Sequence, residues 1–376
     1  MDQLLQPPPP EPVRSSNSSS ESEPEPDPLP EKEFPLLLLP PNALTKQIGF
    51  FDLLTVILLS TLSKRCFKTT KTAKYTCSHI SLSIDGEGTQ ITCMKVGEET
   101  VFINFVFPDQ SIPSQMNLNT VVPNYVNIWI IEGLEVDLTN DTDNVRAWID
   151  HFVMLFHQEQ IDLLTLGHSD FTMDSIKETF NNIRIRELFL LECLPRNEAR
   201  TALQSFQPSG ILNVFPNPFL GEDNVVDKEG MKQFLFQNRG HLLFGRQFTI
   251  PLDEMLLCKA TFIEFTDHDI SAKNLNKFIK MWIHGSIPDM EYLSISFPNN
   301  RKLNETVLFK GIQFDKLGDA VRRTKNLRYD PGNDYEAQGG YEIRDLKHRR
   351  ATIILEKNEA GRTVYFFKMV IWTDSD

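Results

Sequence analysis

The sequence predicts a mixed fold of the α+β and α/β classes, in which a short helical unit precedes an irregular βα solenoid flanked by antiparallel strands. Three observations lead to this prediction: a dense apolar segment at residues 34–74, a strand motif that recurs within residues 141–300, and alternating apolar residues on both sides of that region. With 376 residues, of which 40% are hydrophobic, the chain can bury an ordinary core in one to three domains.

Residues 1–33 are predicted to be a disordered arm. They are mostly Pro, Ser, Glu and Asp, as in the run PPPPEP that begins at Pro7. A segment of this composition buries too little apolar surface to offset the conformational entropy that folding removes.

Residues 34–74 hold more apolar side chains than a unit of this length can bury. Asn42 is a suitable N-cap for a first short helix, and Asp52 is a suitable N-cap for a second. The second helix is apolar on nearly every face. Because fewer than about 50 residues rarely form a self-sufficient core, a partner is expected to cover part of this segment. Its apolar run of about 13 residues is shorter than the roughly 20 that a membrane span needs, so no membrane partner is expected.

Residues 75–140 are predicted to form a β-rich linker or cap. The stretch HISLSIDGEGTQITCMKVGEETVFINFVF, which starts at His79, alternates polar and apolar residues around a turn at residues 86–88. Further strand character is present in YVNIWIIEGLEVDL, which starts at Tyr125. A period of two indicates antiparallel strands with one buried face.

Residues 141–300 are predicted to form a leucine-rich-repeat-like βα solenoid. The pattern LxxLxLxxNxL is matched by Ile161-Leu164-Leu166-Ser169-Phe171, Ile185-Leu188-Leu190-Cys193, Leu212-Val214-Asn217-Phe219, Ile263-Phe265-His268-Ile270 and Met290-Leu293-Ile295, with a degenerate unit near Leu242 and Phe244. The first three units step by 24 residues. Helices are expected from about Asp143, and at Met173 to Phe180, Glu198 to Phe206, Glu229 to Phe236 and Ala272 to Ile283. Each helix returns the chain so that the next strand pairs in parallel.

Residues 301–376 are predicted to form a β-meander that caps the open end of the solenoid. The segments GGYEIRDL, RATIILEK and RTVYFFKMVIW alternate and are separated by polar turns. Terminal units of a solenoid must be shielded from pairing with other chains.

The net charge and the cysteine pattern argue against some kinds of partner and site. The net charge of −13 and the pI near 5.2 disfavour nucleic acid as a partner, because the chain repels phosphate backbones. The basic patches Arg322-Arg323 and His348-Arg349-Arg350 are interpreted as solvated faces or strand-edge charges, with an acidic substrate motif as the alternative. The five cysteines form no CxxC pair and are odd in number, which argues against a disulfide framework or zinc module and favours a reducing, intracellular compartment.

No pattern of catalytic, cofactor-binding or metal-ligating residues stands out in the sequence. A phosphate-binding glycine loop is absent from it. In Asp267-His268-Asp269 the neighbouring side chains are expected to point in different directions, and helix capping by Asp269 or Ser271 is favoured over metal binding. Cys193 occupies the turn position of a repeat and is expected to be a buried structural thiol. The chain is therefore expected to be no enzyme and to need no cofactor or metal.

Two parts of the sequence resemble signatures of one protein family. The order Phe34-Pro35, Leu39-Pro40, Ala43-Leu44, Ile48, Asp52, Val56-Ile57, Leu59-Ser60 and Ser63-Lys64-Arg65 resembles an F-box of the large nematode family of F-box proteins. Residues Asp267 to Phe297, DHDISAKNLNKFIKMWIHGSIPDMEYLSISF, are similar to the type 2 F-box-associated domain that accompanies this F-box. Leu53, Thr55 and Leu58 depart from the usual proline, glutamate and polar residue, which makes this box more apolar than its relatives.

The resemblance implies the substrate-recognition subunit of a Skp-cullin-F-box type ubiquitin ligase, which acts in the cytoplasm, the nucleus or both. Residues 34–74 would bind a Skp-type adaptor and through it a cullin, and the C-terminal region would bind an unknown protein substrate. The residues that the resemblance implies for adaptor binding are Pro35, Leu36, Leu39, Pro40, Leu44, Ile48, Leu54, Ile57 and Leu59.

Two alternatives stay open. The first is a leucine-rich-repeat interaction scaffold with no ligase role, whose apolar N-terminal helices pack on their own solenoid as a cap. The second is an intracellular hydrolase, which would need a convergent polar constellation that the sequence does not display.

Overall fold

The computed structural model describes residues 36–97, 99–107, 116–131, 133–139, 143–221, 223, 225–237, 240–246, 248, 250–287, 289–298, 301–326, 334–358 and 364–372. The predicted arm at residues 1–33 lies outside these residues. The chain divides into two units, Met1–Pro40 and Pro41–Asp376. Within the first unit, Leu36–Leu38 form the short 3-10 helix η1.

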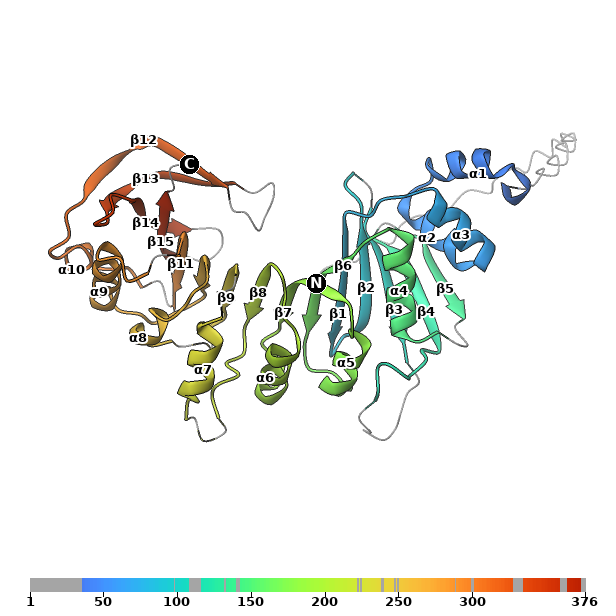
Figure 1. Ribbon diagram of the computed structural model, residues 1–376, viewed down its shortest axis with the longest axis horizontal. Helices are drawn as coiled ribbons and strands as arrows, with labels where there is room; N and C mark the ends of the chain where they lie inside the picture. Colours follow the sequence, from blue (N-terminus) through green and yellow to red (C-terminus); the bar gives the residue numbers. More distant parts are fainter. Residues whose placement is uncertain are drawn as a thin grey trace, which may run out of the picture. The chain divides into compact units, whose positions relative to one another are not determined.

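The second unit begins with three short helices, α1 (Pro41–Ile48), α2 (Leu53–Thr61) and α3 (Lys64–Thr72), which are labelled in Figure 1. Asp52 caps α2 as predicted, because its carboxylate accepts a hydrogen bond from the backbone N–H of Thr55. The prediction that Asn42 caps α1 is wrong. The helix already includes Pro41, whose fixed φ and missing N–H suit a first helical position, so Asn42 is the second residue of the helix.

The chain is a mixed α/β protein with one large sheet. In the described residues the sheet has fifteen strands in the order β12-β13-β14-β15-β11-β10-β9-β8-β7-β6-β1-β2-β3-β4-β5. Its parallel part contains β1 (His79–Asp85), β6 (Gln160–Leu166), β7 (Arg184–Leu190), β8 (Ile211–Val214), β9 (His241–Phe244), β10 (Phe262–Phe265) and β11 (Tyr292–Phe297).

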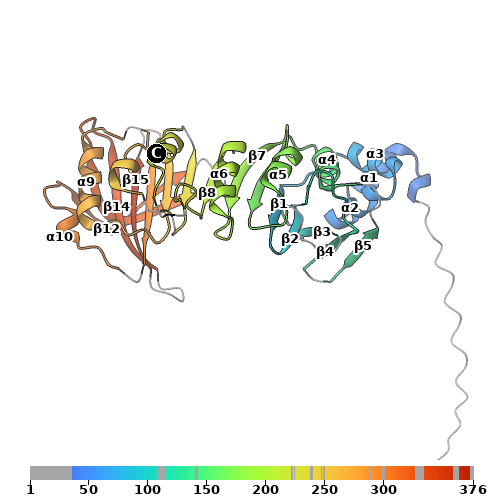
Figure 2. The ribbon, with the colours of Figure 1, turned by 90° about the horizontal axis from the view of Figure 1, so that it is seen from below.

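Helices connect the successive parallel strands from β6 to β11. They are α5 (Met173–Thr179), α6 (Arg196–Ser205), α7 (Lys228–Leu235), α8 (Leu252–Met255) and α9 (Ala272–Ile283), and α4 (Val145–Leu155) precedes β6. Right-handed crossovers between parallel strands in sequence order place their helices on the same face of a sheet. Figure 2 shows α4, α5 and α6 along one face.

One row of predicted motif residues forms a continuous apolar ladder across the parallel strands. Its members are each at most 1% exposed and pair directly in register: Leu164, Leu188, Leu212, Leu242, Ile263 and Leu293. The degenerate unit near Leu242 therefore contributes a regular strand, β9, to the sheet.

Antiparallel strands extend the sheet at both ends, as predicted from the alternation. On one side lie β2 (Gly88–Met94), β3 (Val101–Val106), β4 (Tyr125–Ile130) and β5 (Glu135–Thr139). On the other side lie β12 (Asp315–Asn326), β13 (Asp334–Arg344), β14 (Arg350–Asn358) and β15 (Val364–Trp372), preceded by α10 (Glu305–Leu308).

Strand β12 is not predicted by the sequence, because its residues DKLGDAVRRTKN are mostly polar. It forms by pairing with β13 around a register shift between Leu317 and Arg322, and it is one of the two edge strands that the sheet has in the described residues. Arg322 and Arg323 thus lie on an edge strand, where charges discourage pairing with other chains. Of the helices in the described ranges, none is long and apolar enough to cross a membrane.

Candidate functional site

The predicted adaptor-binding residues occupy two different environments. Leu44, Ile48, Leu54 and Ile57 are buried inside the second unit. Leu59 is half-buried. These four residues are part of the interior of the helical unit, which consists of α1, α2 and α3. Burial within this chain therefore accounts for more of the apolar character of α2 than the sequence suggests.

The remaining predicted residues precede α1, in the first unit of the chain. Leu36 and Leu39 are half-buried, and Pro40 is exposed. Pro35 lies outside the described residues.

Two large apolar side chains of the helical unit are exposed and are missed by the sequence reasoning. Phe50, which follows α1, is 75% exposed, and Leu62, the C-cap of α2, is 68% exposed. Both stand beside helix ends, where the helical spacing that identifies buried positions no longer applies. Both side chains are accessible to a partner.

The helical unit packs on α4 of the same chain. The Oγ of Ser60 in α2 lies 2.8 Å from the Nε2 of His151 in α4. Since the Ser60 hydroxyl donates its proton to the carbonyl of Ile57 at 2.6 Å, the His151 N–H is the donor in the contact between α2 and α4. The ring of Phe67 in α3 lies 4.6 Å from the His151 ring, measured between centroids. His151 therefore joins α2, α3 and α4.

Burial disfavours the charged form of His151. It lowers the pKa of the imidazole from 6.5 to about 4, against a smaller opposing effect of the Asp143 carboxylate. A second contact between the helical unit and the body involves the Nε2 of His157, which lies 2.8 Å from the backbone oxygen of Lys71. The apolar N-terminal helices are thus covered in part by their own chain.

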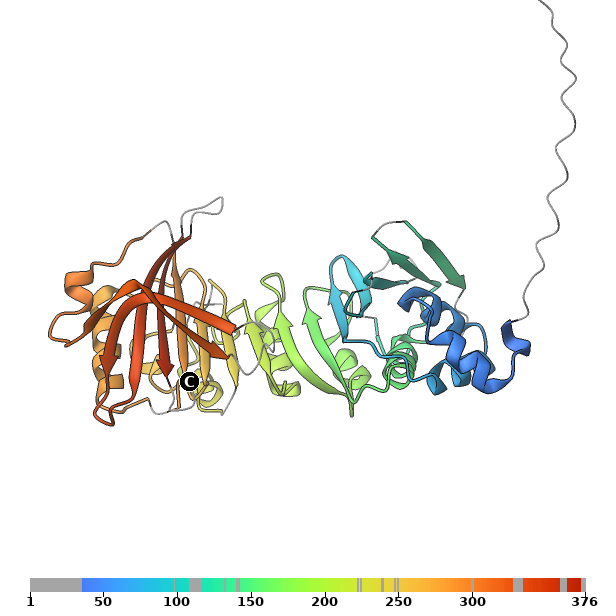
Figure 3. The ribbon, with the colours of Figure 1, turned by 90° about the horizontal axis from the view of Figure 1, so that it is seen from above.

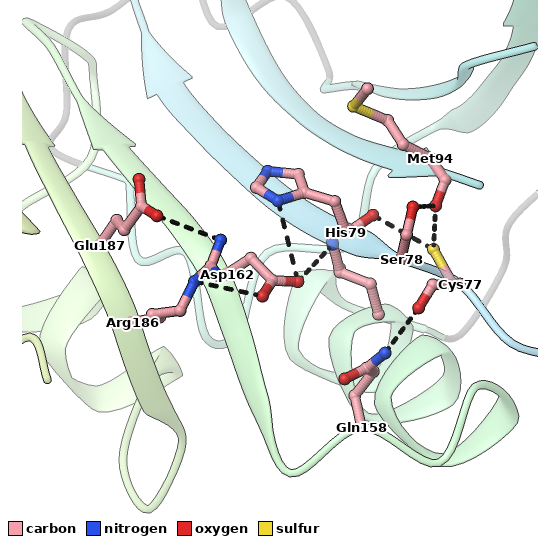
Figure 4. A network of polar contacts seen from close by, with 9 residues as sticks. Cys77, Ser78, His79, Met94, Gln158, Asp162, Arg186 and Glu187 are labelled. Carbon is pink, nitrogen blue, oxygen red and sulfur yellow. Dashed lines mark hydrogen bonds and ion pairs between the residues drawn. The ribbon is translucent and has the colours of Figure 1, made fainter. Parts of the chain in front are cut away.

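A polar network joins the start of β1 to its neighbours β2 and β6 and, beyond β6, to β7 (Figure 4). Asp162 accepts a hydrogen bond from the backbone N–H of Ile80 at 2.8 Å, and its carboxylate faces the guanidinium of Arg186 at 3.5 Å and the imidazole of His79 at 4.0 Å. Glu187 pairs with the other side of Arg186 at 3.1 Å. The carboxylate thus satisfies a strand-edge N–H that would otherwise be buried without a partner.

Cys77 belongs to the same network and makes structural contacts. Its thiol lies 3.0 Å from the carbonyl of Met94 and 3.1 Å from that of His79, and its backbone oxygen accepts from the side chain of Gln158 at 2.7 Å. Burial raises the pKa of the neighbouring Cys93 thiol. The His79 imidazole faces Asp162 instead of the thiol, so these groups do not form a nucleophile and base pair.

In the Asp267-His268-Asp269 triplet, the side chains of His268 and Asp269 have different partners, as expected. The backbone N–H of Asp267 bonds to Ser296, the buried His268 ring accepts from the backbone N–H of Ile250, and Asp269 contacts Arg301. Capping of α9 falls to Ser271, whose hydroxyl accepts from the backbone N–H of Asn274.

The expectation for Cys193 is wrong, because this thiol is exposed. The turn after β7 buries the adjacent Leu194 in its place. The repeat pattern predicts the presence of a turn but leaves the inward residue free to shift by one position.

Two comparisons relate the chain to known proteins. Residues 231–295, which run from α7 into β11, match a family described as F-box associated. The chain is 25% identical over 284 residues to the F-box associated domain-containing protein sdz-33 of Caenorhabditis elegans, a match that covers 75% of this chain and 85% of that protein. No solved structure matches the chain.

The comparisons support the part of the resemblance that concerns the F-box-associated domain. The matched residues include most of the predicted block, with helix α9 and its fully buried Trp282. The family match does not extend to residues 34–74, so the F-box stays a prediction.

Proposed function

We propose that this chain is a substrate-recognition subunit of a Skp-cullin-F-box type ubiquitin ligase. The observation that carries the proposal is the F-box-associated match at residues 231–295, in a chain whose residues 41–72 form three short helices with exposed apolar side chains beside them. The helical unit would bind a Skp-type adaptor, and the adaptor would bind a cullin. The parallel units and the C-terminal strands would form a leucine-rich-repeat-like solenoid that presents a protein target inside the cell. The chain itself would perform no bond chemistry.

The adaptor contact is assigned to apolar groups that solvent reaches. Phe50 and Leu62 are the most exposed of these in the helical unit, and the half-buried Leu59 adds a smaller surface. Burial of one large apolar side chain contributes about 1.5 to 3 kcal/mol. Phe50 and Leu62 together thus supply roughly 3 to 6 kcal/mol, which must be supplemented by contacts of the preceding segment, because association costs at least several kcal/mol of entropy.

Co-expression with a Skp-type adaptor tests this assignment. The double variant Phe50→Asp with Leu62→Asp places two charges on the contact surface and should abolish co-purification of the adaptor. Val96→Asp is the matched control, because Val96 is 87% exposed and lies in the β2–β3 turn. Equal recovery of the adaptor with the double variant and the parent would contradict the assignment.

A second pair of substitutions tests the first unit of the chain. Leu39→Ala with Pro40→Ala should also abolish adaptor co-purification, while residues 76–376 stay folded. Circular dichroism and the melting temperature of the variant report the folding. Adaptor recovery at the parental level would remove Leu39 and Pro40 from the contact.

The second candidate function is an interaction scaffold without a ligase role. The contacts of Ser60 and Phe67 with His151 favour it, because through them the apolar helices are covered in part by α4 of the same chain. Limited proteolysis of the chain expressed alone separates the candidates. A scaffold should resist cleavage at residues 34–74 without any partner, whereas an adaptor-binding unit should gain protection when the adaptor is added.

A further inference from the structure

The antiparallel strands at one end of the sheet, β1 to β5, present a face that none of the described helices covers. In Figure 3 the helices α1 to α4, coloured blue to green, lie on one side of these strands. On β1 the residues of the helix side, Ile80, Leu82 and Ile84, are buried, whereas Ser83 and Asp85 on the opposite face are half-buried. In the described part of the chain, the opposite face is accessible to a partner, most of all on β5, where Glu135 and Asp137 are exposed.

This helix-free face is acidic. The five strands contain no Lys or Arg, and their one histidine, His79, faces Asp162. The carboxylates of the face are Asp85, Glu135 and Asp137, and Glu87 lies in the β1–β2 turn. A sheet face with several carboxylates and few cations of its own is complementary to a positively charged partner.

One end of the face combines carboxylates with an aromatic platform. The ring of Trp129 stacks on that of Phe102 with 4.3 Å between centroids. The side-chain amide of Asn127 donates to Glu135 at 2.7 Å and to Asp137 at 2.8 Å, which holds both carboxylates on one side of the edge strand β5. A hollow of about 350 Å³ is lined by Trp129, Asn127 and Glu135. An aromatic face beside carboxylates suits the side chain of Lys or Arg.

The other end of the face has a second acidic hollow. It measures about 410 Å³ and is lined by Asp85, Glu87, Gln90 and Asn104, and Asn104 lines the first hollow as well. Asp85 is held in place by hydrogen bonds from the hydroxyl of Ser83 at 2.6 Å and from the backbone N–H of Glu87 at 2.9 Å. The two hollows are thus neighbours along the same face.

The strand order fixes the distance between the two acidic ends. Asp85 lies on β1 and Asp137 lies on β5, so the two residues are four strand spacings apart. In the strand register, the β1 residue in line with Asp137 is Ser83, which is two residues from Asp85. With strands about 4.8 Å apart, the separation is about 20 Å. An extended chain advances about 3.3 Å per residue, so about six residues span it.

We propose that this face binds an extended, cationic segment of a target protein, with one Lys or Arg side chain at Trp129, Glu135 and Asp137 and another, about six residues away, at Asp85 and Glu87. The proposal rests on the proposed function, since it names the chemical class of the target that the chain would present.

Fluorescence anisotropy of labelled peptides on the full chain tests the proposal. The probe carries two Arg residues about six positions apart in a Gly-Ser background. The reference peptides carry Gln at both positions or bring the two Arg residues close together. The probe should bind about tenfold more tightly than either reference, and its affinity should fall as salt is raised.

Variants of the chain locate the binding. Glu135→Gln with Asp137→Asn keeps carbonyl oxygens that can accept from Asn127 but removes the charges, and it should weaken probe binding about tenfold. Asp85→Asn with Glu87→Gln should do the same. Glu178→Gln is the matched control, because Glu178 is exposed on α5, on the helix side of the sheet. Adaptor co-purification, measured on the same variants, should be unchanged.

The proposal is overturned if the probe does not bind, if the reference peptides bind as tightly, or if Glu178→Gln weakens binding as much as the substitutions on the face. Failure of the parent chain to bind the adaptor would instead contradict the proposed function and leave the peptide result to stand on its own.

Discussion

Replacing His151 with Gln removes a titratable ring from the contact between the N-terminal helices and α4. Burial lowers the pKa of His151 from 6.5 to about 4. A folded-state pKa below the unfolded value means that the folded protein binds the proton less readily. The contribution of this group to stability is therefore complete above pH 6.5 and is lost as the pH falls toward 4.

The expected loss follows from these two pKa values. At about pH 5.5, protonation of the unfolded chain at His151 lowers the free energy of unfolding by about 1 kcal/mol relative to neutral pH, and at about pH 4.5 by about 2 to 3 kcal/mol. Urea unfolding followed by tryptophan fluorescence at about pH 7.5 and about pH 5.5 measures this difference. Between these pH values, the free energy of unfolding of His151→Gln should fall by about 1 kcal/mol less than that of the parent.

A second buried histidine provides the control for this measurement. Burial also lowers the pKa of His268 from 6.5 to about 4, so His268→Gln should reduce the pH dependence by a similar amount, and the double variant by the sum of both. If His151→Gln and the parent lose the same free energy between the two pH values, His151 is not held neutral by burial at the α2–α4 contact.

Three further predictions concern folding. Trp282→Ala should lower the free energy of unfolding by roughly 3 to 5 kcal/mol, because Trp282 is fully buried, whereas Met281→Ala at a partly exposed neighbour should cost far less in the same urea titration. Asp52→Ala should cost about 1 kcal/mol through loss of the α2 cap, and a melting temperature equal to the parent's would count against the cap. Gly245→Ala should destabilise the protein, because an added Cβ would lie 2.6 Å from the backbone of Phe215; unchanged stability in thermal unfolding would show that the turn can move.

The parallel strands are the part of the fold that the sequence predicts best. Leu164, Leu188 and Leu212 recur at a constant spacing, and each occupies the same register position on neighbouring strands. Helix α9 has the bounds that its apolar spacing predicts. Local patterns suffice there because each unit repeats one strand and one helix, and burial of the same position in every unit reinforces the signal.

Strand β12 could not be predicted, because long-range contacts determine it. Lys325 is 1% exposed, although a lysine in a polar stretch is ordinarily expected in solvent. Its ammonium group donates to the backbone oxygen of Ile371 at 2.8 Å and pairs with Glu291 at 3.2 Å. These partners are distant from Lys325 in the sequence, so the local sequence carries no sign of them.

The candidate site illustrates the same limit. The apolar sequence of α2 predicts a foreign partner, yet α4 covers part of this helix through the contact of His151 with Ser60, whose sequence separation is 91. Exposure of Phe50 and Leu62 likewise depends on how the helices pack. Sequence identifies the segment, but it cannot divide the segment into interior and surface.

This division decides which substitutions can test the adaptor hypothesis. Leu54 and Ile57 are buried, so their replacement by Ala is expected to cost about 2 to 5 kcal/mol of stability and would weaken adaptor binding even if neither residue touched the adaptor. Loss of binding in such variants therefore cannot separate a direct contact from an unfolded helical unit.

Substitutions at exposed positions avoid this ambiguity. Phe50 and Leu62 are mostly exposed, so a charge at either position changes the surface while the interior keeps its packing. Adaptor binding that survives Phe50→Asp with Leu62→Asp could still fail with Leu54→Ala. That result would show that binding requires a folded helical unit and that the adaptor does not contact Phe50 and Leu62.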